Sequence, residues 1–144
     1  KFFTIIKSNK VYFGEKDFQQ LKIIEKFIQE KYKSLDLVSV PTKRSEEGIA
    51  YSSRNEKLTK KQIQDFVSFH QQTVNFLKSL EKSLGVEAAN KKAKDFIVEQ
   101  GIEELDYFEF RNNDDLSFNG KVSESRLFYA IYKGKIRLID NLKI

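Results

Sequence analysis

The sequence predicts two units: a small α/β unit of strand, helix and strand, followed by an α+β unit of two helices and a three-stranded antiparallel sheet. Three observations lead to this prediction. Apolar residues near the start run as strand, amphipathic helix and strand. They then recur at helical spacing over residues 59–100, and residues 105–139 carry short aromatic and branched runs typical of strands. We expect the units to be residues 1–44 and 45–144.

The composition indicates a folded protein and narrows its function. Of 144 residues, 40% are hydrophobic and 13% aromatic, enough for a core. Cysteine is absent, which excludes disulfides and cysteine metal sites and fits a cytoplasmic protein. No apolar run approaches the roughly 20 residues of a membrane helix, so we expect no membrane contact. The net charge of +5 comes from lysines interspersed with glutamates, so nucleic-acid binding is the weaker interpretation.

The first unit reads as a βαβ element. Residues 11–13 form a strand ending at Gly14, and residues 35–40 form a buried strand ending before Pro41. The helix between them has an apolar stripe of Phe18, Leu21, Ile24, Phe27 or Ile28, and Tyr32. Such a crossover is right-handed and its strands are parallel. Because two strands and one helix cannot bury both faces of a parallel sheet, we expect other chain segments to complete it.

The second unit begins with helices and ends with strands. Thr59 and Gln62 have capping-box spacing, and the helix that they open is expected to run to Gly85. A second helix over residues 86–100 should bury Ala89, Ala93, Phe96 and Ile97. The expected strands are residues 105–110, 127–132 and 136–139, with a tight connection at Lys133 and Gly134. His70, the only histidine, is expected to be hydrogen-bonded at the edge of the core rather than catalytic.

The first candidate motif spans residues 12–20, where a parallel strand passes into a helix. Ligands of α/β sheets bind beyond the carboxyl ends of strands. Gly14 allows close approach of a ligand, and Lys16 carries a charge suited to phosphate. Asp17 and Gln20 have the spacing of a helix cap and its partner, so the residues alone leave capping and ligand binding open.

The second candidate motif spans residues 41–55. The hydroxyls of Ser52 and Ser53, followed by the guanidinium of Arg54 on a glycine-containing loop, suit a polyphosphate. A plain polar linker would use the same residue types. A third segment, residues 133–141, reads as a hairpin and closing strand with an architectural role. Residues 112–115 read as a turn because they lack the spaced ligands and terminal glutamate of a calcium loop.

Taken together, three segments resemble the pantothenate synthetase family. They are Tyr-Phe-Gly-Glu-Lys-Asp at residues 12–17, the stretch from Pro-Thr at 41–42 to Ser-Ser-Arg-Asn at 52–55, and Arg-Leu-Ile-Asp-Asn at 137–141. The resemblance implies that residues 1–44 are the C-terminal portion of a Rossmann-like nucleotidyltransferase domain and that residues 45–144 are an α+β lid domain. It implies an ATP-dependent ligase that uses Mg²⁺, activates pantoate as pantoyl adenylate and joins it to beta-alanine.

The resemblance also assigns roles to individual residues. Gly14 and Asp17 would contact the ribose, Lys16 the phosphates and Gln20 pantoate. Ser52, Ser53 and Arg54 would grip the ATP phosphates, and main-chain groups near Lys43 and Tyr51 would flank the adenine. The family's usual pattern has an aliphatic residue at position 43 and methionine at position 51, so the chain departs from it at both adenine contacts.

The family's charge-stabilising histidines lie in its amino-terminal half, which has no counterpart in these residues. The resemblance therefore implies that this chain holds no catalytic residue, is inactive alone and belongs to an enzyme that dimerises through that other half. Two alternatives stay open from the sequence: a non-catalytic basic module that binds nucleic acid or protein, and another class I adenylyl-transfer enzyme acting on a different acid.

Overall fold

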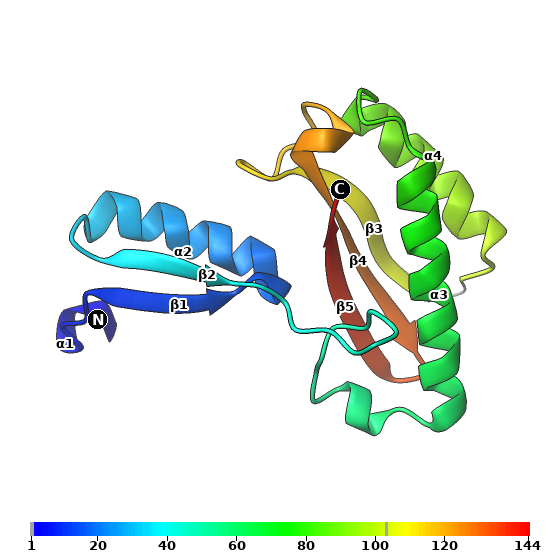
Figure 1. Cartoon of the computed structure of the whole chain (residues 1–144), viewed down its shortest axis with the longest axis horizontal. Coiled ribbons are helices and arrows are strands. Elements are labelled where there is room, and N and C mark those ends of the chain that lie inside the picture. The colour runs from blue at the N-terminus through cyan, green and yellow to red at the C-terminus, as the bar shows by residue number, and fades with distance from the viewer. Residues whose placement is uncertain (1, 103) are drawn as a thin grey trace. The chain divides into compact units, whose positions relative to one another are not determined.

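The computed structural model describes residues 2–102 and 104–144. These residues form two compact units, Lys1–Thr42 and Lys43–Ile144. Figure 1 shows the elements of each unit. No helix in the described part of the chain is long and apolar enough to cross a membrane.

The first unit contains a parallel βαβ element, as predicted. Strand β1 (Lys10–Gly14) leads through a 3₁₀ turn (Glu15–Asp17) into helix α2 (Phe18–Lys31), and strand β2 (Asp36–Val40) returns beside β1. The pairing places Gly14 opposite Val40, so the carboxyl ends of both strands lie at one sheet edge. A four-residue helix α1 (Phe2–Ile5) was not predicted, because four residues are too few to show a helical period.

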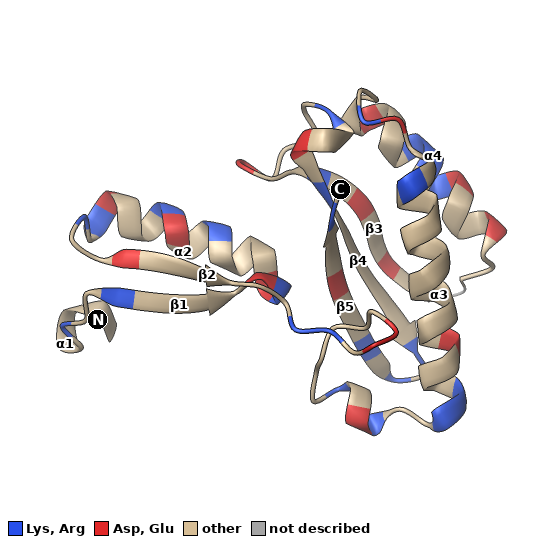
Figure 2. Ribbon diagram, in the orientation of Figure 1, with Lys and Arg blue, Asp and Glu red and all other residues tan. Residues whose placement is uncertain are grey.

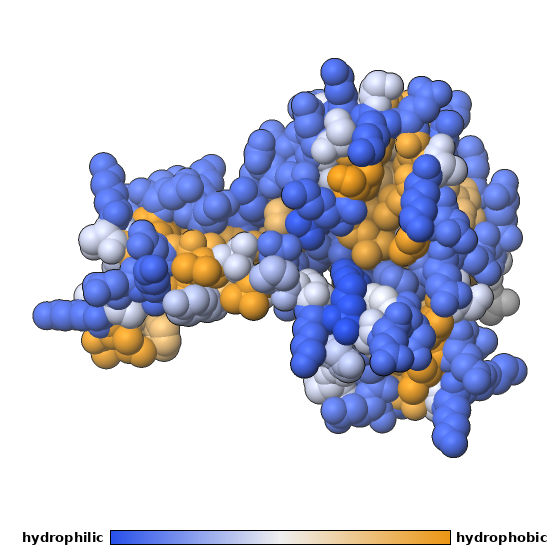
Figure 3. Space-filling model, viewed as in Figure 1, coloured by the Kyte–Doolittle hydropathy of each residue, from blue (hydrophilic) through white to orange (hydrophobic). Residues whose placement is uncertain are grey.

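The core of the first unit is small. Phe18, Leu21 and Ile28 of α2 are buried. In contrast, Tyr12 and Ile23 are each about two-thirds exposed. Figure 3 shows apolar side chains at the surface over α1 and the two strands. A two-stranded sheet with this much exposed apolar surface has little to stabilise it.

We expect the first unit to be the less stable part of the chain. Amides of β1 and β2 should exchange with deuterium at least about tenfold faster than those of the buried sheet of the second unit, because local opening exposes little further apolar surface. Hydrogen exchange followed by mass spectrometry measures both sets in one sample. Slow and uniform protection in a demonstrated monomer would contradict the expectation.

The second unit is a layer of two helices on an antiparallel sheet, as predicted. Helix α3 (Lys60–Ser79) and helix α4 (Val86–Glu99) cover one face of a sheet with strand order β3-β4-β5 (Figure 1). The strands are β3 (Leu105–Asn112), β4 (Ser125–Lys133) and β5 (Ile136–Lys143), each extending beyond its predicted bounds. The capping box of Thr59 and Gln62 at the start of α3 is present.

The core of the second unit lies between the helices and the central strand. Leu127, Tyr129 and Ile131 of β4 have no exposed surface. Aromatic rings join the layers: Phe69 of α3 meets Tyr129 edge-to-face at 5.4 Å between ring centroids. Ala89, Ala93, Phe96 and Ile97 are buried as predicted. Because its core side chains are closely packed, β4 is expected to be a rigid strand of this unit.

The hairpin between β4 and β5 has a two-residue turn. Lys133 pairs with Ile136, which leaves Gly134 and Lys135 as the connection. Gly134 has φ +62°, the positive value that the first turn position of a type II′ hairpin requires. The tight connection was predicted, and the structure moves it by one residue.

The predicted end of the first long helix is wrong. Helix α3 ends at Ser79, and Gly85 instead occupies the N-cap position of α4. The backbone between the helices bonds elsewhere: Val122 N–H donates to the Leu84 carbonyl at 2.8 Å, and Val86 N–H donates to the Gly120 carbonyl at 3.0 Å. These tertiary hydrogen bonds outweigh the helical periodicity that includes Leu84.

Candidate functional site

The predicted residues of the first unit lie at the carboxyl edge of its sheet. Gly14 ends β1, Lys16 and Asp17 lie in the 3₁₀ turn, and Gln20 is in the first turn of α2. A Cβ added to Gly14 would meet no atom within 4 Å, so the space beside its backbone is open. All four residues therefore lie within residues 14–20, at the carboxyl edge of the sheet, where α/β proteins bind their ligands.

The capping interpretation of Asp17 and Gln20 is wrong. Asp17 takes the N-cap position of α2 but accepts no capping hydrogen bond through its side chain. The preceding 3₁₀ turn leaves it at φ −99° and ψ +58°, outside the extended conformation of an N-cap aspartate. Asp17 and Gln20 are both exposed. The helix does not use these two side chains as a cap, which favours the ligand interpretation.

The loop that begins the second unit is folded back on itself. Arg44 and Ala50 form an antiparallel bridge, and Tyr51 N–H donates to the Lys43 carbonyl at 3.0 Å. The Lys43 ammonium lies 5.7 Å from the centre of the exposed Tyr51 ring. The structure thus brings the two predicted adenine-flanking residues together.

The three phosphate-binding candidates follow directly on this loop. Arg54 N–H donates to the Ser52 hydroxyl at 3.2 Å, and Asn55 N–H donates to the Ser52 carbonyl at 3.0 Å, which makes a tight turn. The side chains of Ser53 and Arg54 are exposed. Asn55 also ties the turn to the loop through its side-chain amide, which donates to the Ala50 carbonyl at 3.0 Å. Short donors and a permanent charge are therefore presented on an ordered turn.

A part-buried ion pair that the sequence did not predict anchors the loop. Arg44 holds the carboxylate of Asp140 on β5 with both terminal nitrogens, at 2.6 Å and 3.0 Å. The Asp140 side chain has no exposed surface. Burial works to lower the pKa of Arg44, but the hydrogen bonds and charge of Asp140 outweigh it, so this pKa is raised and the guanidinium stays charged.

Tyr129 and His70 extend this network. Tyr129 O–H donates to Asp140 Oδ2 at 3.3 Å, and His70 Nδ1 lies 3.3 Å from the Tyr129 oxygen. Burial, reinforced by the negative charge of Asp140, raises the pKa of Tyr129 well above its ordinary value. The tyrosine is therefore neutral and gives its one proton to Asp140, so His70 Nδ1–H donates to Tyr129. His70 is buried and hydrogen-bonded, as predicted.

The His70 pKa makes the stability of the second unit depend on pH. Burial lowers it, and the positive charge of Arg44 adds to this against the opposing attraction of Asp140. The unfolded chain binds a proton at His70 near pH 6.5, whereas the folded chain resists it until a lower pH. The unfolded state then binds more protons, so stability falls as the pH drops below about 6.5.

Urea unfolding of the chain and of His70→Gln between pH 7.5 and 5 tests this expectation. The free energy of unfolding should decline more steeply in the unmodified chain over that window. Parallel profiles for the two proteins would contradict it.

Sequence reasoning missed Arg44, Asp140 and Tyr129 as parts of the site. Arg44 and Asp140 both fall inside segments singled out from the sequence, residues 41–55 and 137–141, but their pairing spans 96 positions. No local period or spacing reports such a pair. The presence of an arginine in one motif and an aspartate in the other was the only sign in the sequence that the two could pair.

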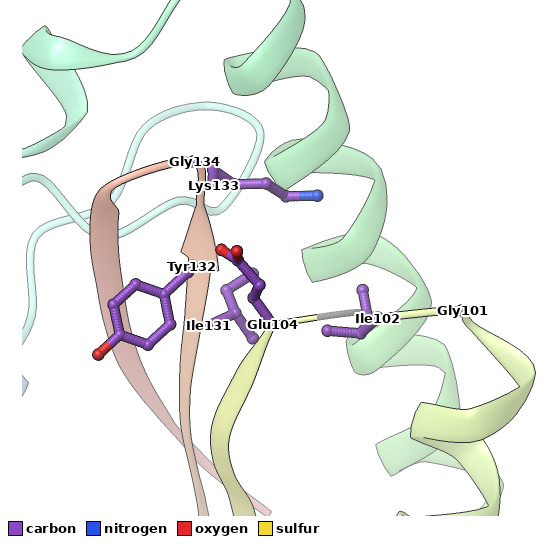
Figure 4. A pocket seen from close by; sticks show the side chains of 7 residues that line it. All are labelled: Gly101, Ile102, Glu104, Ile131, Tyr132, Lys133 and Gly134. Carbon is purple, nitrogen blue, oxygen red and sulfur yellow. The ribbon is translucent and has the colours of Figure 1, made fainter.

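A hollow in the described surface lies apart from the predicted binding residues. The hollow has a volume of about 300 Å³ and lies between the β4–β5 hairpin and the segment after α4. Figure 4 shows the residues that line it, Glu104 and Lys133 among them. The hollow shares no residue with the predicted site. Among residues 2–102 and 104–144, no three His, Cys, Asp or Glu side chains gather as a metal site.

The charges on the helix of the first unit are mixed. Figure 2 shows basic and acidic residues alternating along the ribbon of α2, and the Lys22 ammonium pairs with the Glu25 carboxylate at 2.6 Å. A stripe of unopposed cations is the usual footprint of a protein that follows a nucleic-acid backbone. The α2 surface lacks that pattern.

Comparison with known proteins points to one family. The family model for pantoate-beta-alanine ligase matches residues 1–143. A pantothenate synthetase from Aquifex aeolicus is 35% identical over 152 residues, covering 100% of this chain and 52% of that relative. One from Caldicellulosiruptor bescii is 32% identical over 147 residues, with the same two shares.

Solved structures agree. Pantothenate synthetase from Thermus thermophilus matches with a TM-score of 0.82 at 26% identity, covering 99% of this chain and 52% of that one. Pantoate-beta-alanine ligase from Francisella tularensis, solved with beta-gamma ATP and beta-alanine, matches with a TM-score of 0.65 at 29% identity, covering 99% and 46%. The chain thus spans about half the length of the relatives it matches. Because the family model covers nearly every residue, this chain belongs to the pantoate-beta-alanine ligase family.

Proposed function

We propose that this chain is the ATP-gripping half of a pantothenate synthetase. Pantoate attacks the α-phosphorus of ATP to give pantoyl adenylate and pyrophosphate, and the amine of beta-alanine then displaces AMP to form the amide of pantothenate. The observation that carries the proposal is the ordered turn of Ser52, Ser53 and Arg54 in a chain that matches the ligase family along its length. The ligase function is favoured over the binding-module alternative for the same reason.

In this proposal the second unit binds the adenine and the phosphates. The Ser52 and Ser53 hydroxyls donate to phosphate oxygens, and Arg54 supplies a charge that persists as pyrophosphate leaves. The Lys43 carbonyl accepts a hydrogen bond from Tyr51, so we assign the adenine contact to the Lys43 N–H. A backbone N–H suits an adenine ring nitrogen whatever the side chain, which makes lysine at this position compatible with the role.

The first unit would bind the ribose and pantoate. The open backbone at Gly14 admits the ribose, and the Asp17 carboxylate, which does not cap the helix, accepts from its hydroxyls. Lys16 is assigned to the phosphates and Gln20 to pantoate. The described residues offer no carboxylate cluster for Mg²⁺, so the metal would be held chiefly by the phosphates of ATP. A cytoplasmic location and dimerisation through the family's other half stay predictions.

The test joins this chain behind the amino-terminal half of the Aquifex aeolicus relative, a protein called here the joined enzyme. We expect the joined enzyme to make pantothenate from ATP, pantoate and beta-alanine with release of AMP and pyrophosphate, and we expect the 144-residue chain alone to make none. A folded joined enzyme without turnover would contradict the proposal. Turnover by the chain alone, in a preparation free of host enzyme, would refute its assignment as half of the site.

A further inference from the structure

The side chain of Arg44 connects two distant segments of the sequence, the loop of residues 43–51 and strand β5. Arg44, in the loop before Ser52, grips Asp140 on β5 through two parallel hydrogen bonds. Its Nη1 also donates to the Gly48 carbonyl, across its own loop, and its Nη2 donates to the Asn141 carbonyl on β5, both at 3.0 Å. One guanidinium therefore closes the loop and fixes it to the sheet.

This grip leaves Arg44 unsuited to bind a ligand itself. A guanidinium has five N–H donors in a fixed plane. Four hydrogen bonds to Asp140, Gly48 and Asn141 occupy its two terminal nitrogens. The loop residues, rather than the arginine, must then face any ligand.

Gly48 and Ile49, also in this loop, are packed against the rest of the second unit. Gly48 has φ +89°, and a Cβ placed on it would lie 2.8 Å from His70 Nε2. Ile49 is 7% exposed and belongs to the core cluster of the second unit. His70 and Asp140 are themselves connected through Tyr129. The loop thus contacts α3 and β5, and Tyr129 of β4 connects these two contacts.

We propose that Arg44 is a positioning residue for nucleotide binding, acting through the loop rather than on the ligand. By fixing residues 43–51 against the sheet, it holds the Lys43 backbone for adenine and presents the turn of Ser52 and Arg54 already ordered. This inference rests on the proposed function for the identity of the ligand. Its structural part, the ordering of the loop by the Arg44–Asp140 pair, is independent of that function.

The first arm of the test measures that ordering in the 144-residue chain. In Arg44→Gln, the amides of Ser45, Gly48 and Tyr51 should exchange with deuterium about tenfold or more faster, while those of β4 change by less than about threefold. Arg44→Lys should fall between, since a point charge cannot reproduce the fork. Unchanged loop exchange, or a loop already unprotected before substitution, would overturn the proposal.

Two further variants serve as controls for this exchange measurement. Arg44→Gln leaves Asp140 buried without its charged partner and risks unfolding the unit. The double variant Arg44→Gln with Asp140→Asn therefore removes both charges, and asparagine keeps the shape of the buried aspartate. This double variant should show the same loop-specific acceleration. The matched control is Arg137→Gln. Arg137 lies on β5, as Asp140 does, and its guanidinium pairs with the exposed Asp106 on β3 rather than with the loop. Loop acceleration in this control equal to that in Arg44→Gln would overturn the proposal.

The second arm measures catalysis in the joined enzyme. Loss of loop ordering should raise KM for ATP about tenfold or more while KM for beta-alanine changes by less than about threefold, and Arg44→Lys should recover part of the loss. An equal rise in both KM values, or a fall in active protein alone, would overturn the positioning role. If the unmodified joined enzyme has no turnover, the proposed function fails, and the exchange arm still decides whether Arg44 orders the loop.

Discussion

Replacing Arg54 with alanine is expected to slow adenylate formation by the joined enzyme about 10- to 150-fold. A charge-assisted hydrogen bond to phosphate is worth about 1.5–3 kcal/mol, and the loss appears in the rate because the charge on the leaving pyrophosphate grows during transfer. Arg54 is exposed in the structure, so its removal disturbs little packing. Pyrophosphate release in single-turnover conditions measures the step directly.

The control for Arg54 is Lys57→Ala. Lys57 is another exposed cation, three residues along in the 3₁₀ turn Asn55–Lys57, and it has no assigned contact with ATP. Its loss should change the rate by less than about threefold, as expected of a screened surface charge. If Arg54→Ala instead lowered the unfolding midpoint with turnover per folded molecule intact, Arg54 would leave the site, and the roles of Ser52 and Ser53 would weaken with it.

Truncating Phe110 to alanine is expected to cost about 3–5 kcal/mol of unfolding free energy in the second unit. Phe110 on β3 has no exposed surface and packs against Phe76 with 6.3 Å between ring centroids. Its backbone is held by Asn90, which bonds both its N–H and its carbonyl, so the strand cannot move inward to fill the space. Urea unfolding followed by far-ultraviolet circular dichroism measures the loss.

Phe118→Ala is the matched comparison for Phe110. Phe118 is 47% exposed, and the Arg111 guanidinium lies over its ring, 4.1 Å from the ring centre. Its truncation should cost about 1 kcal/mol or less. Similar losses for the two phenylalanines would show that the buried sheet does not dominate the stability of this unit.

The fold was largely predictable because its elements carry local signals. The strand–helix–strand start, the capping box at Thr59 and the hairpin glycine at position 134 each depend on neighbouring residues. The prediction failed where distant residues decide the outcome. Leu84 fits the period of α3, yet its carbonyl accepts a hydrogen bond from Val122, and the helix stops five residues earlier.

The sequence predicted which segments form the candidate site, but it did not predict the contacts that their side chains make. The motifs around Gly14 and Ser52 stand out because glycine, hydroxyl and basic residues follow strands. Their internal chemistry did not follow from residue types: Asp17 has the spacing of a helix cap but makes no capping hydrogen bond. The segment around Asp140 was recognised as architectural, but that its carboxylate holds the loop by Arg44 became visible only in three dimensions.

The pairing of Arg44 with Asp140 determines when the loop can take its final form during protein synthesis. Asp140 is translated 96 residues after Arg44, which at about 5–20 residues per second is a delay of roughly 5–20 s. Throughout that interval Arg44 lacks its acceptor, and the core cluster to which Ile49 belongs is incomplete, because Leu142 follows Asp140. A nascent chain on the ribosome is therefore unable to hold the loop in its final form until the last strand of the sheet has been made.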